Sequence, residues 1–407
     1  MRDTASAPNY PDEDGAPSGA GLRRVLTFWP LVLYGMGVIV GAGIYVALAA
    51  VMARAGPAAP IAFLLAGLSA GLTGLCYADL AGRFPQAAGA AAYVRLGFNS
   101  DFLGLLVGAA TTFAVATAAA AIAHGAVQFL VNLVPVSPLL LTGALVAAFT
   151  CVAAAGVRSS VGIAAAAGVI EIAGLLAAIA AGLMTAPEYH RPDIVPTSFT
   201  EWRAALAGAF IAFFAFIGFE TLANMAEETK NPRSTVPLSI LVAVAASIIL
   251  YVGVALAAVL AGQGGANPLL ALFEGSTARV FAVLAFVAVA NGVLVEIMML
   301  SRLFYGMANT GQLPAWLAAV NPRTRTPAVA TLTAGVIVLA AAVLLPFESL
   351  LVLTNAVALG IFLLVDLALV LIHRREPTPV GSFVAPRWVP PAAALVSAAL
   401  LAAEILS

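Results

Sequence analysis

Eleven apolar runs, most of about 20 residues, make up most of this chain, and short segments with charges or prolines separate them. An α-helix of this length crosses the hydrocarbon core of a bilayer, so each run predicts one membrane span. Because 62% of the residues are hydrophobic and only 9% are charged, an ordinary soluble domain is excluded. We predict an all-α polytopic membrane protein. The spans are expected at about 26–52, 57–81, 102–131, 138–157, 160–184, 205–226, 237–262, 279–306, 328–346, 349–372 and 388–406.

The remaining sequence leaves little room for other domains. Residues 1–22 are rich in Asp, Glu, Pro, Ser and Gly and predict a disordered cytoplasmic tail. Residues 23–407 then form a single transmembrane domain. The sequence contains no zinc-ligand spacing, phosphate-binding loop or nucleophile elbow, and its Lys and Arg are scattered among short loops. We therefore expect no enzymatic activity, no cofactor, no metal and no nucleic-acid partner.

The distribution of Lys and Arg predicts how the spans are oriented. With the amino terminus in the cytoplasm, fourteen of the 18 Lys and Arg lie on the cytoplasmic side, and the other four are Arg54, Arg191, Arg203 and Arg279. This is the bias of the positive-inside rule. It predicts a multi-pass protein of the cell membrane whose carboxyl terminus, after eleven spans, lies outside.

Two of the apolar runs carry glycines or a carboxylate at their centres, in the segments Gly37–Tyr45 and Phe213–Glu220. In hydrocarbon an unwound backbone is tolerated only where protein or a water-filled cavity supplies hydrogen-bond partners. We therefore predict that the first and sixth spans are broken at a binding site in mid-membrane. Because the breaks lie five spans apart, they also fit an inverted repeat, with one copy at about 26–184, the second at about 205–372 and an extra span at about 388–406.

The two breaks offer complementary chemistry. Amides at the start of a half-helix attract a carboxylate, and free carbonyls at the end of one suit an ammonium group. An α-amino acid carries both groups. The predicted substrate-binding residues are Val40, Gly41, Ala42, Gly43 and Ile44 in the first span and Phe214, Ala215, Phe216, Ile217 and Gly218 in the sixth.

Each of these features has a plainer interpretation. Gly37 and Gly41 match the small-residue motif of closely packed membrane helices, so they are equally consistent with packing and with unwinding. Glu220 lies two residues after the predicted break, where a carboxylate caps the following half-helix. We favour this capping role over contact with substrate.

Four segments together resemble the amino acid–polyamine–organocation permeases. They are Gly37–Val46, with the sequence GVIVGAGIYV, Tyr77–Gly89, Phe213–Pro237 and Ser301–Pro314. The resemblance implies a transporter fold of five-plus-five inverted repeats, with substrate bound at broken helices one and six and with alternating access. It also implies transport of amino acids or related amines, with the substrate carboxylate on the amides of Ala42, Gly43 and Ile44. Members commonly have twelve spans, and the eleven here leave any dimer contact made by a twelfth in doubt.

Acids inside the spans ask for a function, because a charge at mid-bilayer costs about 2.5–3.5 kcal/mol even on the lenient insertion scale. The candidates for coupling or proton binding are Glu171, Glu296 and Glu220, and Asp366 is a further intramembrane acid. In proton-coupled members of the resembling family, the place of Glu171 is often taken by lysine. Glu171 then either binds the coupling ion itself, which we expect to be a proton, or forms a hydrogen bond with a neighbouring helix.

We predict a permease for amino acids that works by proton symport or by exchange. The alternatives are a polyamine or organic-amine carrier, in which Glu171 or Glu296 binds a second amine, and a membrane sensor or subunit that transports nothing. The sequence leaves the substrate and the oligomeric state open.

Overall fold

The structure is a computed structural model of the chain. It describes residues 24–85, 89–130, 135–155, 157–186, 192–262, 267–375 and 381–405. The helices within these ranges are α1 (Phe28–Ala55), α2 (Ala59–Arg83), α3 (Gly89–Phe98), α4 (Asp101–Gln128), α5 (Pro138–Ala155), α6 (Val157–Thr185), α7 (Phe199–Phe213), α8 (Thr221–Asn224), α9 (Pro232–Leu260), α10 (Gly275–Asn309), α11 (Ala328–Leu344), α12 (Phe347–Arg375) and α13 (Val389–Ile405).

The predicted class is confirmed: among the described residues, helices cover every expected span, with α7 and α8 sharing the sixth. Eight described stretches are long and apolar enough to cross a membrane, and the first of them contains both α1 and α2. Two shorter apolar helices lie at Ala328–Leu344 and Val389–Ala402. The protein is therefore a multi-pass membrane protein.

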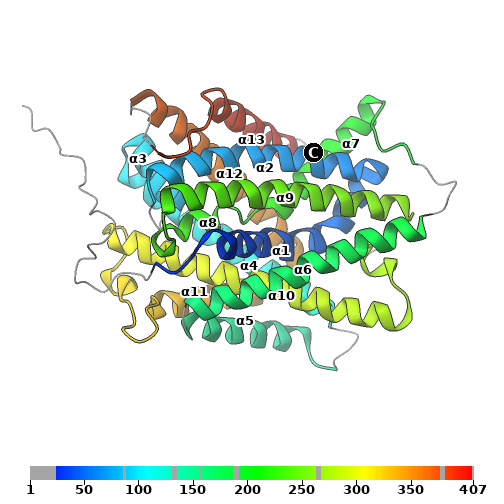
Figure 1. Cartoon of the computed structure of the whole chain (residues 1–407), viewed down its shortest axis with the longest axis horizontal. Helices are drawn as coiled ribbons and strands as arrows, with labels where there is room; N and C mark the ends of the chain where they lie inside the picture. The colour runs from blue at the N-terminus through cyan, green and yellow to red at the C-terminus, as the bar shows by residue number, and fades with distance from the viewer. Residues whose placement is uncertain are drawn as a thin grey trace, which may run out of the picture.

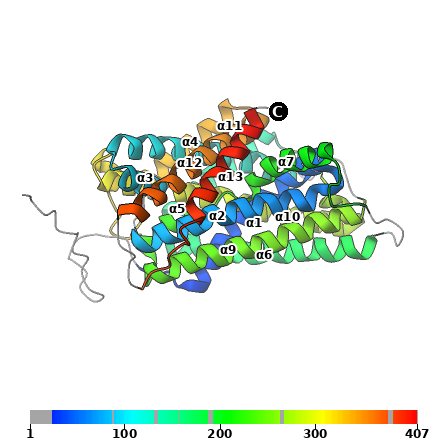
Figure 2. The same cartoon turned by 90° about the horizontal axis from the view of Figure 1, so that it is seen from above.

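The long helices run roughly parallel to the longest axis of the molecule (Figures 1 and 2). Helix α1 lies at the centre, where it packs against α6, α7, α9 and α10. Outward-facing apolar side chains, among them Leu140 on α5, Val336 on α11 and Leu395 on α13, are more than 60% exposed. Bare apolar surface of this kind on the outer helices is suited to contact with lipid.

Helix α3 was not predicted. Its ten residues rise only about 15 Å, too little to cross a bilayer, so the search for long apolar runs passed over it. Gly89 begins the helix with a φ of 45°, a value that glycine adopts without strain. The helix packs against α4 and α12 and closes one end of the bundle.

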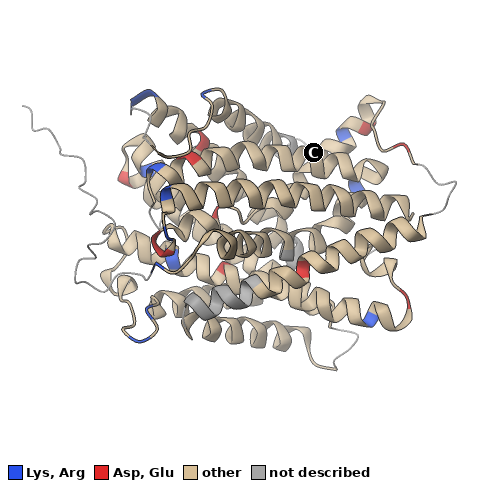
Figure 3. Cartoon of the chain, viewed as in Figure 1, with Lys and Arg blue, Asp and Glu red and all other residues tan. Residues whose placement is uncertain are grey.

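Lys and Arg gather at one end of the helix bundle, on the left in Figure 3. We call this the basic end: α1 and α9 begin there, and α2, α10 and α12 end there. Arg54 and Arg203 belong to the opposite end, near the end of α1 and the start of α7.

Candidate functional site

The sixth span is interrupted, as predicted. Helix α7 ends at Phe213, a single 3₁₀ turn covers Phe214–Phe216, and Ile217 is extended, with φ and ψ of −61° and 135°. Gly218 follows with a φ of 127°, in a region that is essentially restricted to glycine. A Cβ on Gly218 would also lie 2.6 Å from Cγ1 of Val38 in α1. Glycine is therefore required here by both the backbone and the packing.

Side chains next to the break satisfy its backbone groups. The N–H of Gly218 donates to Oε2 of Glu220 at 2.8 Å, and the hydroxyl of Thr221 donates to the carbonyl of Gly218 at 2.6 Å. Water is scarce at this depth, so such local partners are what make an interrupted helix tolerable. Glu220 was expected to cap the half-helix after the break, but its side chain makes no cap hydrogen bond to α8 and instead holds the backbone of the break itself at Gly218.

The first span is not interrupted. Helix α1 is continuous from Phe28 to Ala55, so the prediction of an unwound segment at 40–44 is wrong for this conformation. In a continuous helix the amides of Ala42, Gly43 and Ile44 donate to carbonyls four residues earlier. They are not available to bind a substrate carboxylate here.

Close packing explains the glycines of α1. A Cβ on Gly43 would overlap the backbone of Ala215 in the sixth span, and a Cβ on Gly168 of α6 would lie 3.1 Å from Cα of Gly37. Small residues let helix backbones approach in this way. For the glycine motif of Gly37 and Gly41, the structure supports the packing interpretation at Gly37, and Gly43 packs closely in the same way.

The predicted acceptors in the sixth span are already occupied. The carbonyl of Phe214 accepts from the N–H of Ile217 at 3.3 Å. The hydroxyl of Tyr251 on α9 lies within hydrogen-bonding distance of two carbonyls, that of Ala215 at 3.0 Å and that of Ile39 in α1. Tyr251 thus joins the two spans where a substrate was expected.

The other predicted substrate-binding residues lie in the same packed interface. Val40, Ile44 and Phe214 are buried in the core, and the ring of Phe216 meets that of Tyr251 edge to face at 5.0 Å. Gly41 and Ala42 belong to α1, but their surroundings lie outside what the structure describes.

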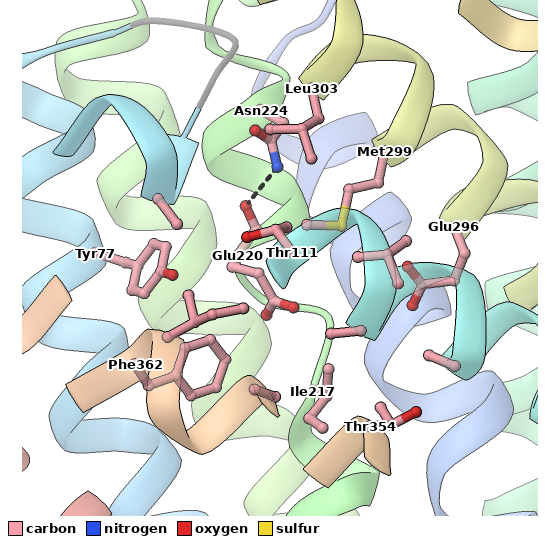
Figure 4. Close-up of a pocket in the computed structure, with 16 residues that line it drawn as sticks. Tyr77, Thr111, Ile217, Glu220, Asn224, Glu296, Met299, Leu303, Thr354 and Phe362 are labelled. Atoms are coloured by element: carbon pink, nitrogen blue, oxygen red, sulfur yellow. Dashed lines mark hydrogen bonds between the residues drawn. The ribbon is translucent and has the colours of Figure 1, made fainter. Parts of the chain in front are cut away.

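A cavity lies on another side of the sixth span (Figure 4). The volume that the centre of a water molecule can occupy in this cavity is about 20 Å³, so the cavity has room for about one water molecule. An amino acid does not fit without movement of the helices. The lining residues are Tyr77, Ala90, Thr111, Ala114, Val115, Ala118, Ile217, Glu220, Asn224, Glu296, Met299, Leu303, Thr354, Ala358, Ile361 and Phe362.

Three residues singled out from the sequence meet at this cavity: Ile217, Glu220 and Glu296. The carboxyl groups of Glu220 and Glu296 point into the same space from the sixth span and from α10 (Figure 4). Both residues are buried, with 7% and 4% of their surface exposed. Ile217, predicted to bind substrate, therefore lines the same cavity as Glu220 and Glu296, the candidates for coupling.

Sequence reasoning missed most of the polar lining. Tyr77, Thr111, Asn224 and Thr354 line the cavity from α2, α4, α8 and α12. The only sign of these residues in the sequence is a polar side chain within an apolar run. This sign is weak because such a side chain can also bond to the backbone of its own helix, as the Thr354 hydroxyl does to the carbonyl of Leu350 at 2.7 Å.

Glu171 lies apart from this cavity, on α6. The side-chain amide of Asn291 on α10 donates to its Oε1 at 3.1 Å, while Oε2 has no hydrogen-bond partner within the described structure. The hydroxyl of Tyr45 is 3.5 Å from the Glu171 carbonyl. The second option, a hydrogen bond to a neighbouring helix, is thus observed. Asn291 and Glu296 both belong to α10, but Asn291 bonds to Glu171 while Glu296 lines the cavity.

Asp366 is held by hydroxyl groups outside the cavity. Its Oδ2 accepts from Thr73 of α2 at 3.1 Å and from Ser397 of α13 at 3.4 Å. Its Oδ1 has no hydrogen-bond partner in the described structure, so Asp366 links three helices through one oxygen and is only partly satisfied.

A buried ion pair and a set of backbone hydrogen bonds join several elements near the basic end. Nε of Arg302 on α10 is 3.0 Å from Oε1 of Glu228, and both side chains are at most 1% exposed. The backbone of Val25 and Leu26 donates to the carbonyl of Glu228, and Lys230 donates to that of Leu26. The entry into α1 is thereby tied to the end of the sixth span.

Sequence comparisons agree on the type of protein. Residues 26–406 match the family described as amino acid permease. The chain is 30% identical over 338 residues to the cationic amino acid transporter 9, chloroplastic, of Arabidopsis thaliana, covering 75% of this chain and 58% of the relative. It therefore spans less than two thirds of that relative's length.

Two bacterial relatives are covered more fully. The chain is 27% identical over 396 residues to the methylthioribose transporter of Bacillus subtilis. It is 26% identical over 403 residues to the branched-chain amino acid permease BcaP of the same organism. Both alignments cover 90% of this chain and 84% of the relative. The names of these relatives differ in the substrate that they state, so the alignments indicate transport more clearly than they indicate what is transported.

Proposed function

The chain belongs to the amino acid permease family, and from this premise we propose that it is a secondary active transporter that moves amino acids across a cell membrane by alternating access. The family is one of permeases rather than enzymes. The observation that carries the mechanism is the broken sixth span, which places a backbone interruption and a buried acid, Glu220, against an internal cavity. Irregular backbone at membrane depth is typical of transporter binding sites.

The cavity and the basic end together support alternating access. The cavity is too small for an amino acid, and the Arg302–Glu228 pair closes the basic end. We interpret this conformation as one with the substrate pathway shut. Opening requires α1 and the sixth span to separate, at the contact between Gly43 and Ala215 or at the backbone link between Leu26 and Glu228.

We further propose that the basic end faces the cytoplasm, which follows from the positive-inside rule. The amino terminus is then cytoplasmic. We also propose that residues of about 26–184 and 205–372 form two inverted repeats. The continuous α1 then occupies the position in the first repeat that the broken sixth span occupies in the second. Unwinding of α1 during the cycle would expose the amides of Ala42, Gly43 and Ile44 to substrate.

For coupling we propose that a buried carboxyl group takes up a proton. Glu171 is the first candidate, since it is fully buried between α6 and α10 and one of its oxygens has no partner in the described structure. Glu171→Gln preserves an acceptor for Asn291 but removes the titrating group. Uptake by this variant is expected to become independent of an imposed pH gradient, and unchanged dependence would exclude Glu171 from coupling.

Transport itself is tested with purified full-length protein in liposomes. Uptake of radiolabelled neutral, basic and acidic amino acids and of putrescine is measured with and without a pH gradient. Saturable uptake of an amino acid supports the proposal, and stimulation by an inward proton gradient supports symport. If none of these compounds enters above protein-free liposomes, the transporter proposal fails in favour of a sensor or subunit.

A further inference from the structure

One buried carboxylate brings two segments of the chain together at the basic end. Oδ2 of Asp79 on α2 lies 2.8 Å from Nε2 of His373, near the end of α12, and accepts from the backbone N–H of Ala385, ahead of α13, at 2.9 Å. The hydroxyl of Ser382 donates to the carbonyl of Gly82 at 3.2 Å. The end of α12 and the segment that leads into α13 are therefore fixed next to one another against α2.

Three arginines lie within two residues of these contacts, and we call them the arginine cluster. Arg374 and Arg375 follow His373 directly, and Arg387 comes two residues after Ala385. All three are exposed, and none of them forms an ion pair within the described part of the chain. In Figure 3 the end of α12 and the segment before α13 both carry positive charge at the outer edge of the bundle.

The arginine cluster has an excess of positive charge. The carboxylate of Asp79 is already paired with Arg83, and residues 373–388 contain one acid, Glu376, which leaves a net charge of +2 from three arginines and one glutamate. Arg375 uses Nη1 to donate to the carbonyl of Gly97 at 3.0 Å. The other guanidinium donors are left for water or for an anion, and their fork geometry matches the oxygens of a phosphate.

The outer face of α13 shows where the cluster lies relative to lipid. Trp388 follows Arg387 directly and is 64% exposed. It begins an exposed stripe that continues along α13, at every third or fourth residue, with Pro391, Leu395 and Ala399. Such a stripe on an outer helix faces hydrocarbon, and an exposed tryptophan at its end marks the level of the lipid headgroups. Arg387 is therefore placed at the depth of the lipid phosphates.

We propose that the arginine cluster, where α12 and α13 meet, binds the phosphate headgroup of an anionic phospholipid. Arg374 and Arg387 hold the phosphate from two segments, Trp388 packs beside the glycerol region, and the acyl chains lie along the exposed stripe of α13. Basic sites between membrane helices recognise anionic headgroups in this way. A soluble phosphate would match the arginines but not the tryptophan and the apolar stripe, which favours a lipid. The inference goes beyond the proposed transport function and is independent of it.

The test measures binding of phosphatidylglycerol to the purified full-length protein in a neutral detergent at about 0.15 M salt. Dissociation constants are taken from the dependence of Tm on the concentration of added phosphatidylglycerol. Phosphatidylcholine with the same acyl chains tests apolar binding alone, and inorganic phosphate tests the free anion.

The variant for this test is Arg374→Gln/Arg387→Gln, which removes two exposed charges that form no ion pair in the described structure. The matched control is Arg323→Gln/Arg325→Gln. It removes two exposed charges from a loop on the far side of the basic end (Figure 3), where screening by salt separates it from the cluster.

Phosphatidylglycerol is expected to raise the Tm of the wild-type protein in a saturable manner, and phosphatidylcholine and inorganic phosphate are not. Arg374→Gln/Arg387→Gln is expected to weaken the binding of phosphatidylglycerol by about tenfold to thirtyfold, because each basic side chain near an anionic lipid contributes about fivefold. The control variant is expected to keep the wild-type affinity to within about twofold. If the double variant does not fold, Arg387→Gln alone is expected to weaken binding by about fivefold.

Three results would overturn the inference. Equal losses of affinity in the cluster variant and in the control variant would show a diffuse attraction to the whole basic end. Equal stabilisation of the wild-type protein by phosphatidylglycerol and phosphatidylcholine would show that the arginines contribute nothing. Equal stabilisation by inorganic phosphate would reject a lipid as the occupant. None of these results bears on the transport proposal, which uptake into liposomes tests separately.

Discussion

Breaking the buried pair of Glu228 and Arg302 is the sharpest test of how the basic end is held shut. Glu228→Gln leaves the guanidinium in place without its counter-charge, and Arg302→Met leaves the carboxylate. Both side chains are at most 1% exposed, so water cannot replace the lost partner. Each single variant is expected to lower the free energy of unfolding by about 3–5 kcal/mol.

The distance in the structure sets the size of the coupling between the two residues. At 3.0 Å, two unit charges attract by about 5 kcal/mol at an effective dielectric constant of about 20. Desolvation offsets part of this attraction. The nitrogens Nη1 and Nη2 of Arg302 and Oε2 of Glu228 also lack hydrogen-bond partners in the described structure, so the pair is not fully compensated. We expect a net coupling of about 2–3 kcal/mol.

A double-mutant cycle measures this coupling. Unfolding in mixed micelles is followed for the wild type, the two single variants and the double variant, which is expected to be more stable than the sum of the single losses predicts. Arg323→Met is the control, since Arg323 is exposed in a loop at the same end, and it is expected to change stability by less than about 0.5 kcal/mol. Losses that add to within about 0.5 kcal/mol would refute the reasoning.

Three further predictions concern the packed interface around α1. Gly43→Ala pushes α1 off the backbone of the sixth span and is expected to lower the free energy of unfolding by about 1–3 kcal/mol. The control is Gly71→Ala, whose added methyl group meets nothing within 4 Å and which is expected to be neutral or to stabilise α2 by up to about 1 kcal/mol. Equal effects of the two substitutions on Tm would refute the contact. Tyr251→Phe removes the hydroxyl that serves two buried carbonyls, and a loss of about 1–3 kcal/mol in unfolding free energy is expected. Asn291→Leu leaves Glu171 without its observed donor and should lower Tm, whereas an unchanged Tm would show that this hydrogen bond contributes nothing to stability.

Local sequence was sufficient to predict the broken sixth span. Gly218 adopts a φ of 127°, a property of the residue type that needs no distant partner. Glu220 bonds to the amide only two positions before it. The length of each apolar run likewise predicts a span without reference to its neighbours.

The first span shows where such reasoning stops. A glycine in an apolar helix permits both unwinding and close packing, and its own sequence does not distinguish them. What decides is the partner: Ala215 and Gly168 belong to other helices and come within contact of α1 only after folding. Helix α3 escaped prediction for a related reason, since a segment too short to span the bilayer is placed by its packing on α4 and α12.

By itself, the sequence determined that the chain is a helical membrane protein, where its spans lie, and that the sixth is interrupted, because hydrophobic length and glycine conformation are local properties. Only the tertiary structure decided which acids lie together. It separates Glu171, bonded to Asn291, from Glu220 and Glu296, which line one cavity. The reason is geometric: a residue's position in a helix gives its direction, but the group that it faces comes from another helix, far away in the chain.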